Sequence, residues 1–319
     1  MHTVQIAPMM GYTHRHYRYL MRRLCPDVLL YSEMVTTGAL LHGDPARHLA
    51  LDMSETPVVL QLGGHSPSAL AECAVLGQQY GYAQINLNVG CPSSRVREGG
   101  IGASLFKTPH VVADCVAAMV DAVDIPVTVK CRIGVDDHDS MAHLLDFSRR
   151  VADAGASSLI VHARKAWLNG LNPKQNRTIP PLRYDLVARL AEQITIPVVL
   201  NGGIRSHEAI SQHLTCFSGV MIGRWACDDP IGFAKRYVDH PQRLSLQQTL
   251  ADYFSYMDSA VDSGQQLSFL IQPLQGLFHG QPGAKKWRKR LNEMARVLAS
   301  RCSQPSTLYQ ETVQDMWIG

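Results

Sequence analysis

The chain has 319 residues, of which 46% are hydrophobic and 18% charged, and its formal net charge at pH 7 is +3. This composition is typical of a globular protein, excludes a disordered chain, and neither demands nor excludes a nucleic-acid partner. No apolar run approaches the ~20 residues of a membrane helix, and the N-terminus lacks the pattern of a secretory signal, so we expect a cytoplasmic protein.

Eight short apolar segments alternate with helical patterns along residues 1–240. Short continuous apolar strands separated by helices are typical of a parallel sheet whose outer face is covered. Eight such units predict an α/β protein of the (β/α)₈ TIM barrel class, with its active site at the carboxyl ends of the strands. We expect strands at Val4–Pro8, Leu29–Met34, Val58–Leu62, Gln84–Asn88, Val127–Cys131, Ser158–Ala163, Val198–Asn201 and Gly219–Gly223.

After residue 240 the strand signals stop and the helical patterns continue. We expect helices at Leu244–Ser263 and Ala284–Ser300, with another around Gln266–Leu277. The sequence therefore predicts a catalytic barrel, residues 1–240, followed by a small C-terminal helical domain, residues 241–319. The pattern leaves the last stretch, Ser303–Gly319, poorly determined.

The residue types that bind metals do not cluster in the sequence. The eight cysteines include no pair with CxxC spacing, which argues against zinc ribbons and thioredoxin-type redox pairs. His14 and His16 are two residues apart, and we expect them not to face each other on a helix. We therefore predict no metal site, and no motif for a Rossmann or P-loop site is present.

The ends of the seventh and eighth predicted strands carry glycines. Asn201-Gly202-Gly203 follows one strand and Gly223-Arg224 the other. Glycine lets backbone N–H groups approach an anion closely, and TIM barrels often bind phosphate in these two loops. The alternative is that the glycines only permit tight turns.

Lys130 and His162 lie at the ends of the fifth and sixth predicted strands. Polar side chains at the rim of a barrel need ligands or partners. A cation and an imidazole donor suit an electron-rich ring carbonyl, such as flavin O2. The alternative is a buried pair whose hydrogen bonds are satisfied within the core.

Cys91 lies in Asn88-Val89-Gly90-Cys91-Pro92, just past the fourth strand. We expect its thiol to be positioned and partly exposed, unlike those of the other seven cysteines. A lone cysteine is more often a small hydrophobe in the core, but the flanking Gly90 and Pro92 and the strand-end location favour a functional thiol. The glycine-rich loop Ser93–Ala103 is of a kind that opens and closes over a ligand.

These motifs, taken together, resemble the tRNA-dihydrouridine synthase family. The resemblance runs in order along essentially the whole chain, and its NxGCP element is highly specific. A further set of motifs is similar to the A-type bacterial subgroup. The family motifs are Asn88–Pro92, Gly102-Ala103, Lys130–Gly134, His162–Arg164, Asn201–Ile204 and Gly223-Arg224, and the subgroup motifs are Met34–Gly38, His162–Trp167 and Gly280–Ala284.

The resemblance implies a flavin-binding barrel with a C-terminal helical domain, FMN as cofactor and NADPH as reductant. It implies hydride transfer from flavin N5 to uracil C6 and protonation of C5 by Cys91, which yields 5,6-dihydrouridine at positions 20 and 20a of the tRNA D-loop. An ordinary thiol is mostly protonated at neutral pH, as a general acid must be. The implied cofactor-binding residues are Pro8, Met9, Met10, Gln61, Lys130, His162, Asn201, Gly202, Gly203, Gly223 and Arg224.

The basic residues indicate where tRNA binds on such an enzyme. Lys285–Arg290 is the densest basic run in the chain and contains an aromatic residue, Trp287. Such a run is usually a solvated helix face, but on an RNA-binding chain it favours phosphate contacts. The long loop Lys165–Arg183 adds more cations. We expect tRNA contacts from Asn88, Lys174, Arg177, Lys285 and Arg288.

Two other functions compete with this hypothesis. The chain could act on a free small molecule, like a relative of dihydropyrimidine dehydrogenase, or bind RNA without catalysis. The basic helical segment argues against the first, and Cys91, Lys130 and His162 argue against the second.

Overall fold

The computed structural model describes residues 3–237, 245–299 and 304–307. The chain forms two compact units, one of Met1–Met10 and Val28–Gly223 and the other of Gly11–Asp27 and Arg224–Gly319. The expected domain boundary between residues 240 and 241, and most of Ser303–Gly319, lie outside the described residues.

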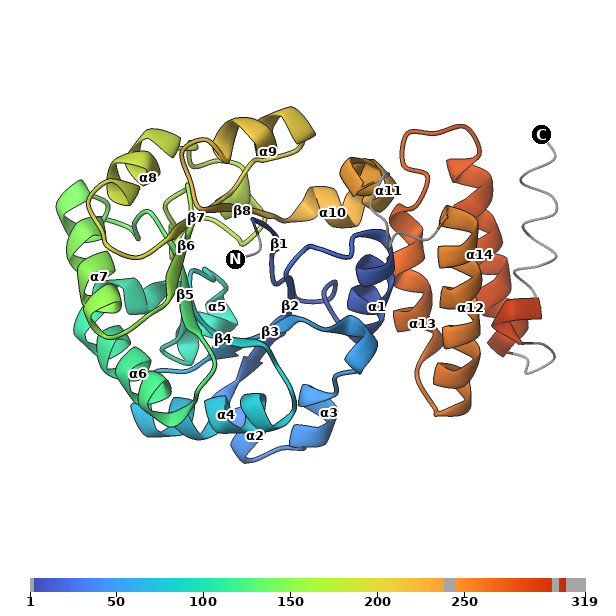
Figure 1. Cartoon of the computed structure of the whole chain (residues 1–319), viewed down its shortest axis with the longest axis horizontal. Helices are drawn as coiled ribbons and strands as arrows, with labels where there is room; N and C mark the ends of the chain where they lie inside the picture. Colours follow the sequence, from blue (N-terminus) through green and yellow to red (C-terminus); the bar gives the residue numbers. More distant parts are fainter. Residues whose placement is uncertain (1–2, 238–244, 300–303, 308–319) are drawn as a thin grey trace. The chain divides into compact units, whose positions relative to one another are not determined.

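The first unit is a barrel of eight parallel strands (Figure 1). Neighbouring strands pair in the order β1-β8-β7-β6-β5-β4-β3-β2. The ring closes where the backbone of Leu29 bonds to Val4 and Ile6 at 3.0 and 2.9 Å. This arrangement confirms the predicted TIM barrel. The strands are β1 (Val4–Ile6), β2 (Leu30–Thr36), β3 (Val58–Gly63), β4 (Gln84–Val89), β5 (Val127–Arg132), β6 (Ser158–His162), β7 (Val198–Asn201) and β8 (Gly219–Ile222).

Helices alternate with the strands and surround the barrel (Figure 1). Several begin at a side-chain cap: Ser66, Ser140 and Ser206 each accept a hydrogen bond from a backbone N–H three residues on. The helices of this unit are α2 (Thr37–Leu41), α3 (Pro45–Leu49), α4 (Pro67–Gln79), α5 (Ser94–Glu98), α6 (Pro109–Ala122), α7 (Met141–Asp153), α8 (Tyr184–Ala191) and α9 (His207–His213), with 3₁₀ turns η1 (Met53–Glu55), η2 (Gly102–Lys107) and η3 (Gln175–Arg177).

Buried apolar side chains fill the barrel interior. Because side chains alternate along a strand, residues two apart share one face of the sheet. The register pairs Lys130 with Ile160, and His162 with Asn201, so these positions share the inner face. The inner core cluster consists of Ala7, Leu29, Tyr31, Val59, Ile160, Val199 and Met221.

The second unit is helical and includes α1 from the N-terminal part of the chain (Figure 1). Tyr253 and Phe254 of α12 and Trp287 of α14 are buried in it. The expected helix around Gln266–Leu277 divides into α13 and a 3₁₀ turn at Pro273, which has no N–H to continue an α-helix. The elements are α1 (Arg15–Leu24), α10 (Arg224–Asp228), α11 (Pro230–Ala234), η4 (Lys235–Tyr237), α12 (Leu246–Asp262), α13 (Leu267–Ile271), η5 (Gln272–Gly276) and α14 (Ala284–Ala299).

The expectation that His14 and His16 do not face each other is wrong. Their ring centroids lie 5.5 Å apart in an edge-to-face arrangement, because His14 precedes the helix and has extended backbone angles. His14 Nε2 bonds to Gln272 Oε1 and His16 Nδ1 to the Tyr256 hydroxyl, each at 2.6 Å. In the described residues no group of three or more His, Cys, Asp or Glu side chains could hold a metal. No helix among them is long and apolar enough to span a membrane.

Candidate active site at the mouth of the barrel

Polar side chains replace the apolar core at the carboxyl ends of the inner strands. Gln61, Asn88, Lys130, His162 and Asn201 occupy the last or nearly last positions of β3 to β7. The parallel register sets Asn88 beside Lys130 and His162 beside Asn201. The structure therefore brings together the polar residues that the sequence placed at separate strand ends.

A directional chain of hydrogen bonds fixes the amides in this region. The Thr128 hydroxyl donates to the Ile85 carbonyl at 3.1 Å, so it accepts from Asn86 Nδ2 at 2.9 Å. Asn86 Oδ1 then accepts from Gln61 Nε2 at 2.8 Å, and Gln61 Oε1 accepts from Asn88 Nδ2 at 2.9 Å. Each amide orientation follows from the one before. Asn86 and Thr128 were not among the predicted site residues, because in the sequence they look like ordinary strand residues.

The last hydrogen bonds of this network hold the backbone at Cys91. Asn88 Oδ1 accepts from the N–H groups of Gly90 at 3.1 Å and Cys91 at 3.0 Å. Gly102 has a φ of +73°, and a Cβ there would lie 2.7 Å from the Cys91 carbonyl oxygen. The loop is thus packed tightly around Cys91. Asn88 was expected to contact tRNA. It is buried, and its side chain instead accepts the hydrogen bonds that hold the turn at Gly90 and Cys91.

Cys91 is a free, half-buried thiol, as expected. The expectation that the other seven cysteines are less exposed is wrong. Cys216, in the loop before β8, is exposed and Cys227 is half-buried. Cys302 lies outside the described residues. Exposure alone does not distinguish Cys91; its location at a strand end and its fixed backbone do.

Lys130 makes no hydrogen bond or ion pair that involves another described residue, although it is only partly exposed. Burial, with a smaller contribution from Arg132, lowers the pKa of its ammonium to about 8. Cys91 lies close enough to Lys130 for a thiolate at Cys91 to raise this pKa. A desolvated ammonium with unused donors is costly unless a ligand accepts from it.

The glycines after β7 and β8 differ. Gly202 has a φ of +112°, and a Cβ there would lie 2.5 Å from His162 Cδ2. Gly203 has a φ of +73° and the same lack of room beside Leu182. Both are therefore required by the turn itself, with or without a phosphate. At Gly223 a Cβ would lie 3.8 Å from Met9 Sδ, in ordinary van der Waals contact, so packing at the end of β8 does not require this glycine.

Two arginines of the site were not among the predicted site residues. Arg164 has a buried Nε for which the described part of the chain offers no acceptor, and its Nη1 donates to the Pro180 carbonyl. Arg132 is buried and donates to three carbonyls, those of Gly90, Lys165 and Asn176, at 2.9, 3.1 and 2.9 Å. Burial lowers the pKa of Arg132 to about 10. Their positions after Lys130 and His162 in the strand-end motifs were the available signal.

The remaining predicted residues lie at exposed or half-buried positions. In the first unit Pro8 and Met9 are half-buried after β1, and Met10, Lys174 and Arg177 are exposed. In the second unit Arg224 begins α10 and is half-buried, and Lys285 and Arg288 are exposed on the first turns of α14. Trp287, the aromatic residue within the basic run, is buried and donates to the Leu274 carbonyl at 2.8 Å.

Comparison with known proteins identifies the family. The family described as Dihydrouridine synthase (Dus) matches residues 5–312. The chain is 48% identical over 302 residues to the tRNA-dihydrouridine(20/20a) synthase of Synechocystis sp., with 93% of this chain and 90% of that protein covered. It is 49% identical to the synthase of the same name from Pseudomonas syringae pv. tomato, with 90% and 87% covered. Vibrio vulnificus has another relative so named, 44% identical, with 92% and 91% covered. The chain therefore belongs to the dihydrouridine synthase family, as its motifs indicated.

Proposed function

We propose that this chain is a tRNA-dihydrouridine synthase that reduces uridines 20 and 20a of the tRNA D-loop, with FMN as cofactor and NADPH as reductant. The observation that carries the proposal is the proximity, at the barrel mouth, of the Cys91 thiol, whose backbone is fixed, and the Lys130 ammonium, which has no hydrogen-bonding partner among the described residues. Family membership supports the reaction, and the names of the relatives support the positions. A tRNA substrate leads us to expect action in the cytoplasm.

The residues at the barrel mouth fit a flavin nucleotide. Among the described residues nothing accepts a hydrogen bond from the Lys130 ammonium or from the buried Arg164 Nε, and at Gly223 the backbone is not covered by a side chain of its own. A flavin offers ring carbonyls and a phosphate that accept such hydrogen bonds. The holding residues would be Pro8, Met9, Met10, Gln61, Lys130, His162, Asn201, Gly202, Gly203 and Gly223; a phosphate contact from Arg224 also stays a prediction.

The protein residues then bind uracil and supply a proton. When bound and reduced, FMN supplies the hydride for uracil C6. Cys91 donates its thiol proton to C5, and solvent protonates the thiolate afterwards, so uridine gains one hydride and one proton. Asn88 holds the Cys91 backbone for this transfer. The protein orients the reactants, as is general for cofactor enzymes.

The target base must leave its stack to reach the mouth of a barrel, as in enzymes that flip bases. Bases of a loop are cheaper to extract than bases of a helix. We expect Lys174 and Arg177, exposed in the loop after β6, and Lys285 and Arg288, exposed on α14, to contact tRNA phosphates. Cations at the first turns of α14 are disfavoured by the helix dipole, which supports a role in binding rather than in stability.

Mass spectrometry of unmodified tRNA, incubated with the protein, FMN and NADPH, tests the function. A gain of two hydrogens, mapped to uridine 20 or 20a, is the expected result. A gain at another uridine would contradict the positions but keep the chemistry. NADPH consumption without modified tRNA, together with saturation by free uracil, would favour a small-molecule reductase instead.

A further inference from the structure

The loop between β6 and α8 presents an aromatic side chain that the proposed reaction does not use. Trp167 is 37% exposed, although a large aromatic side chain is normally more buried. The Lys165 ammonium lies 3.9 Å from the centroid of its ring, in cation–π contact with one face. The other face is therefore the one that a partner would meet.

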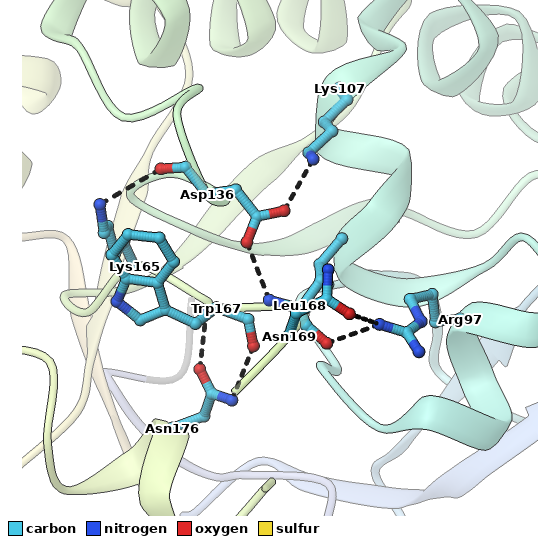
Figure 2. A network of polar contacts seen from close by, with 8 residues as sticks. All are labelled: Arg97, Lys107, Asp136, Lys165, Trp167, Leu168, Asn169 and Asn176. Atoms are coloured by element: carbon cyan, nitrogen blue, oxygen red, sulfur yellow. Dashed lines mark hydrogen bonds and ion pairs between the residues drawn. The ribbon is translucent and has the colours of Figure 1, made fainter. Parts of the chain in front are cut away.

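The backbone that carries Trp167 is held at every polar atom (Figure 2). Asn176, fully buried, accepts from the Trp167 N–H at 2.8 Å and donates to its carbonyl at 2.9 Å. For the next residue, Leu168, Asp136 accepts from the N–H at 2.9 Å and Arg97 donates to the carbonyl at 2.6 Å. Loops are usually held far less completely.

Asp136, which holds the Leu168 N–H, adopts an unfavourable backbone conformation. Asp136 has a φ of +48°, in the left-handed region that most residues avoid. Its carboxylate also pairs with Lys107 at 2.7 Å, and its carbonyl accepts from Lys165 at 3.2 Å (Figure 2). Burial raises the pKa of Asp136, but the hydrogen bonds from Lys107 and from the Leu168 N–H outweigh it and hold this pKa below its ordinary value. The network therefore fixes an exposed tryptophan rather than a buried one.

The same network connects Trp167 to the Cys91 loop. Arg97, six residues after Cys91, bonds to Leu168 and to Asn169 Oδ1, the latter at 2.6 Å (Figure 2). From the other side, the Arg132 guanidinium contacts both the Gly90 carbonyl and the Lys165 carbonyl. The tryptophan is thus tied to the loop that holds the reactive thiol.

We propose that Trp167 is a stacking platform for an unpaired RNA base next to the uridine that enters the barrel. The proposal rests on the proposed tRNA function. Extraction of a uridine leaves its neighbours without their own stacking partner, and base–aromatic stacking tolerates any base. A rigid tryptophan loses little conformational freedom on binding, so pre-organisation adds to affinity. The exposed Lys174 of the same loop supplies positive charge for a flanking phosphate, whereas the Lys165 ammonium is already paired with Asp139 at 2.7 Å.

The experiment measures the affinity of the full-length protein for unmodified tRNA at several salt concentrations. The variants are Trp167→Leu and Trp167→Phe. Ile179→Ala is the matched control, because Ile179 is 58% exposed in the same loop. We expect Trp167→Leu to weaken binding about tenfold and Trp167→Phe to retain most of it. The salt dependence should stay unchanged, because no phosphate contact is lost. Flavin content, NADPH oxidation and melting temperature should match the wild type.

Two results would overturn the proposal. One is wild-type affinity in Trp167→Leu. The other is weaker binding accompanied by an altered salt slope or by an equal loss in Ile179→Ala, which would indicate an electrostatic or general structural effect. Tryptophan fluorescence adds a direct readout: tRNA should quench a component that Trp167→Phe lacks. Failure of the proposed function is distinguishable, since it appears as absence of dihydrouridine with the wild-type protein.

Discussion

Each of the two units contains a cluster of basic and other polar side chains that are largely shielded from solvent, and the clusters differ in whether their hydrogen-bonding capacity is used. In the helical unit His14 forms a hydrogen bond with Gln272, and His16 forms one with Tyr256. At the barrel mouth Lys130 has no hydrogen-bonding partner among the described residues, and the Arg164 Nε has no acceptor. Buried polar groups are normally satisfied. The Thr249 hydroxyl of the helical unit also has no partner among the described residues. An unsatisfied group therefore indicates a ligand only where, as at Lys130, it is a charged group at the carboxyl end of a barrel strand.

Replacement of Lys130 should have the largest effect, because it should lower activity and raise the stability of the flavin-free protein. We expect Lys130→Met to lower the rate of dihydrouridine formation about 10²–10³-fold, as for loss of a pre-organised charged donor. The same change should stabilise the flavin-free protein at pH 7 by up to about 3 kcal/mol, because a desolvated ammonium is removed. Rate assays and thermal unfolding measure the two effects. An inactive variant that is also less stable would contradict the account of Lys130.

The pH dependence of Lys130 has a definite sign. Its pKa of about 8 lies below the ordinary value of 10.5, so the unfolded chain binds more protons between these values. Stability of the flavin-free protein should therefore rise as pH increases through this window, and this rise should be absent in Lys130→Met. Lys130→Arg keeps the charge and should move any alkaline loss of activity that Lys130 causes to higher pH.

Replacement of His16 should have the opposite effect: it should lower stability and leave catalysis unchanged. His16→Phe leaves the Tyr256 hydroxyl without its partner, so we expect a loss of about 1–3 kcal/mol at pH 7 with unchanged dihydrouridine formation per folded enzyme. Burial lowers the pKa of His16 to about 3. The wild type should therefore lose stability as pH falls from 6.5 towards 3, and His16→Phe should lose less. Reduced catalysis at full folding would place His16 in the functional machinery.

The amide chain should respond more mildly than Lys130. Thr128→Val removes the hydroxyl that orients Asn86, so we expect about a tenfold slower formation of dihydrouridine, at the lower end of such effects. Flavin reduction by NADPH should slow less than uridine reduction, because Gln61 is only one of several residues that would hold the flavin. Thr128→Ser, which keeps the hydroxyl, should restore the rate. Equal losses in both variants would show that packing, not the hydrogen bond, matters.

The smallest effect concerns the surface of α14. Replacement of both Lys285 and Arg288 by alanine should weaken tRNA binding several-fold and reduce the slope of log affinity against log salt by up to about 2. Lys289→Ala is a control, because that residue already faces Glu293 at 3.7 Å. An unchanged slope in the double variant would make the basic run an ordinary solvated helix face.

Local patterns sufficed to predict the strands and the strand-end residues, because apolar runs and turn residues are short-range signals. The hydrogen-bonded histidine cluster could not be predicted, since His14 meets Gln272 across 258 positions of sequence. The amide chain was missed for the same reason: Asn86 and Thr128 gain their roles only from neighbouring strands. Trp287 is a core residue, but its position within the basic run Lys285–Arg290 gave no sign of burial in the sequence.

The Cys91→Ala variant tests whether Cys91 is the general acid, because the reaction has two steps that can be measured apart. Flavin reduction by NADPH and subsequent uridine reduction on tRNA can be followed separately under single-turnover conditions. The account predicts wild-type flavin binding and reduction, with dihydrouridine formation slowed about 10²–10⁴-fold, the usual contribution of a general acid. Product formation at the wild-type rate would contradict the assignment of Cys91 as the acid at the mouth of the barrel.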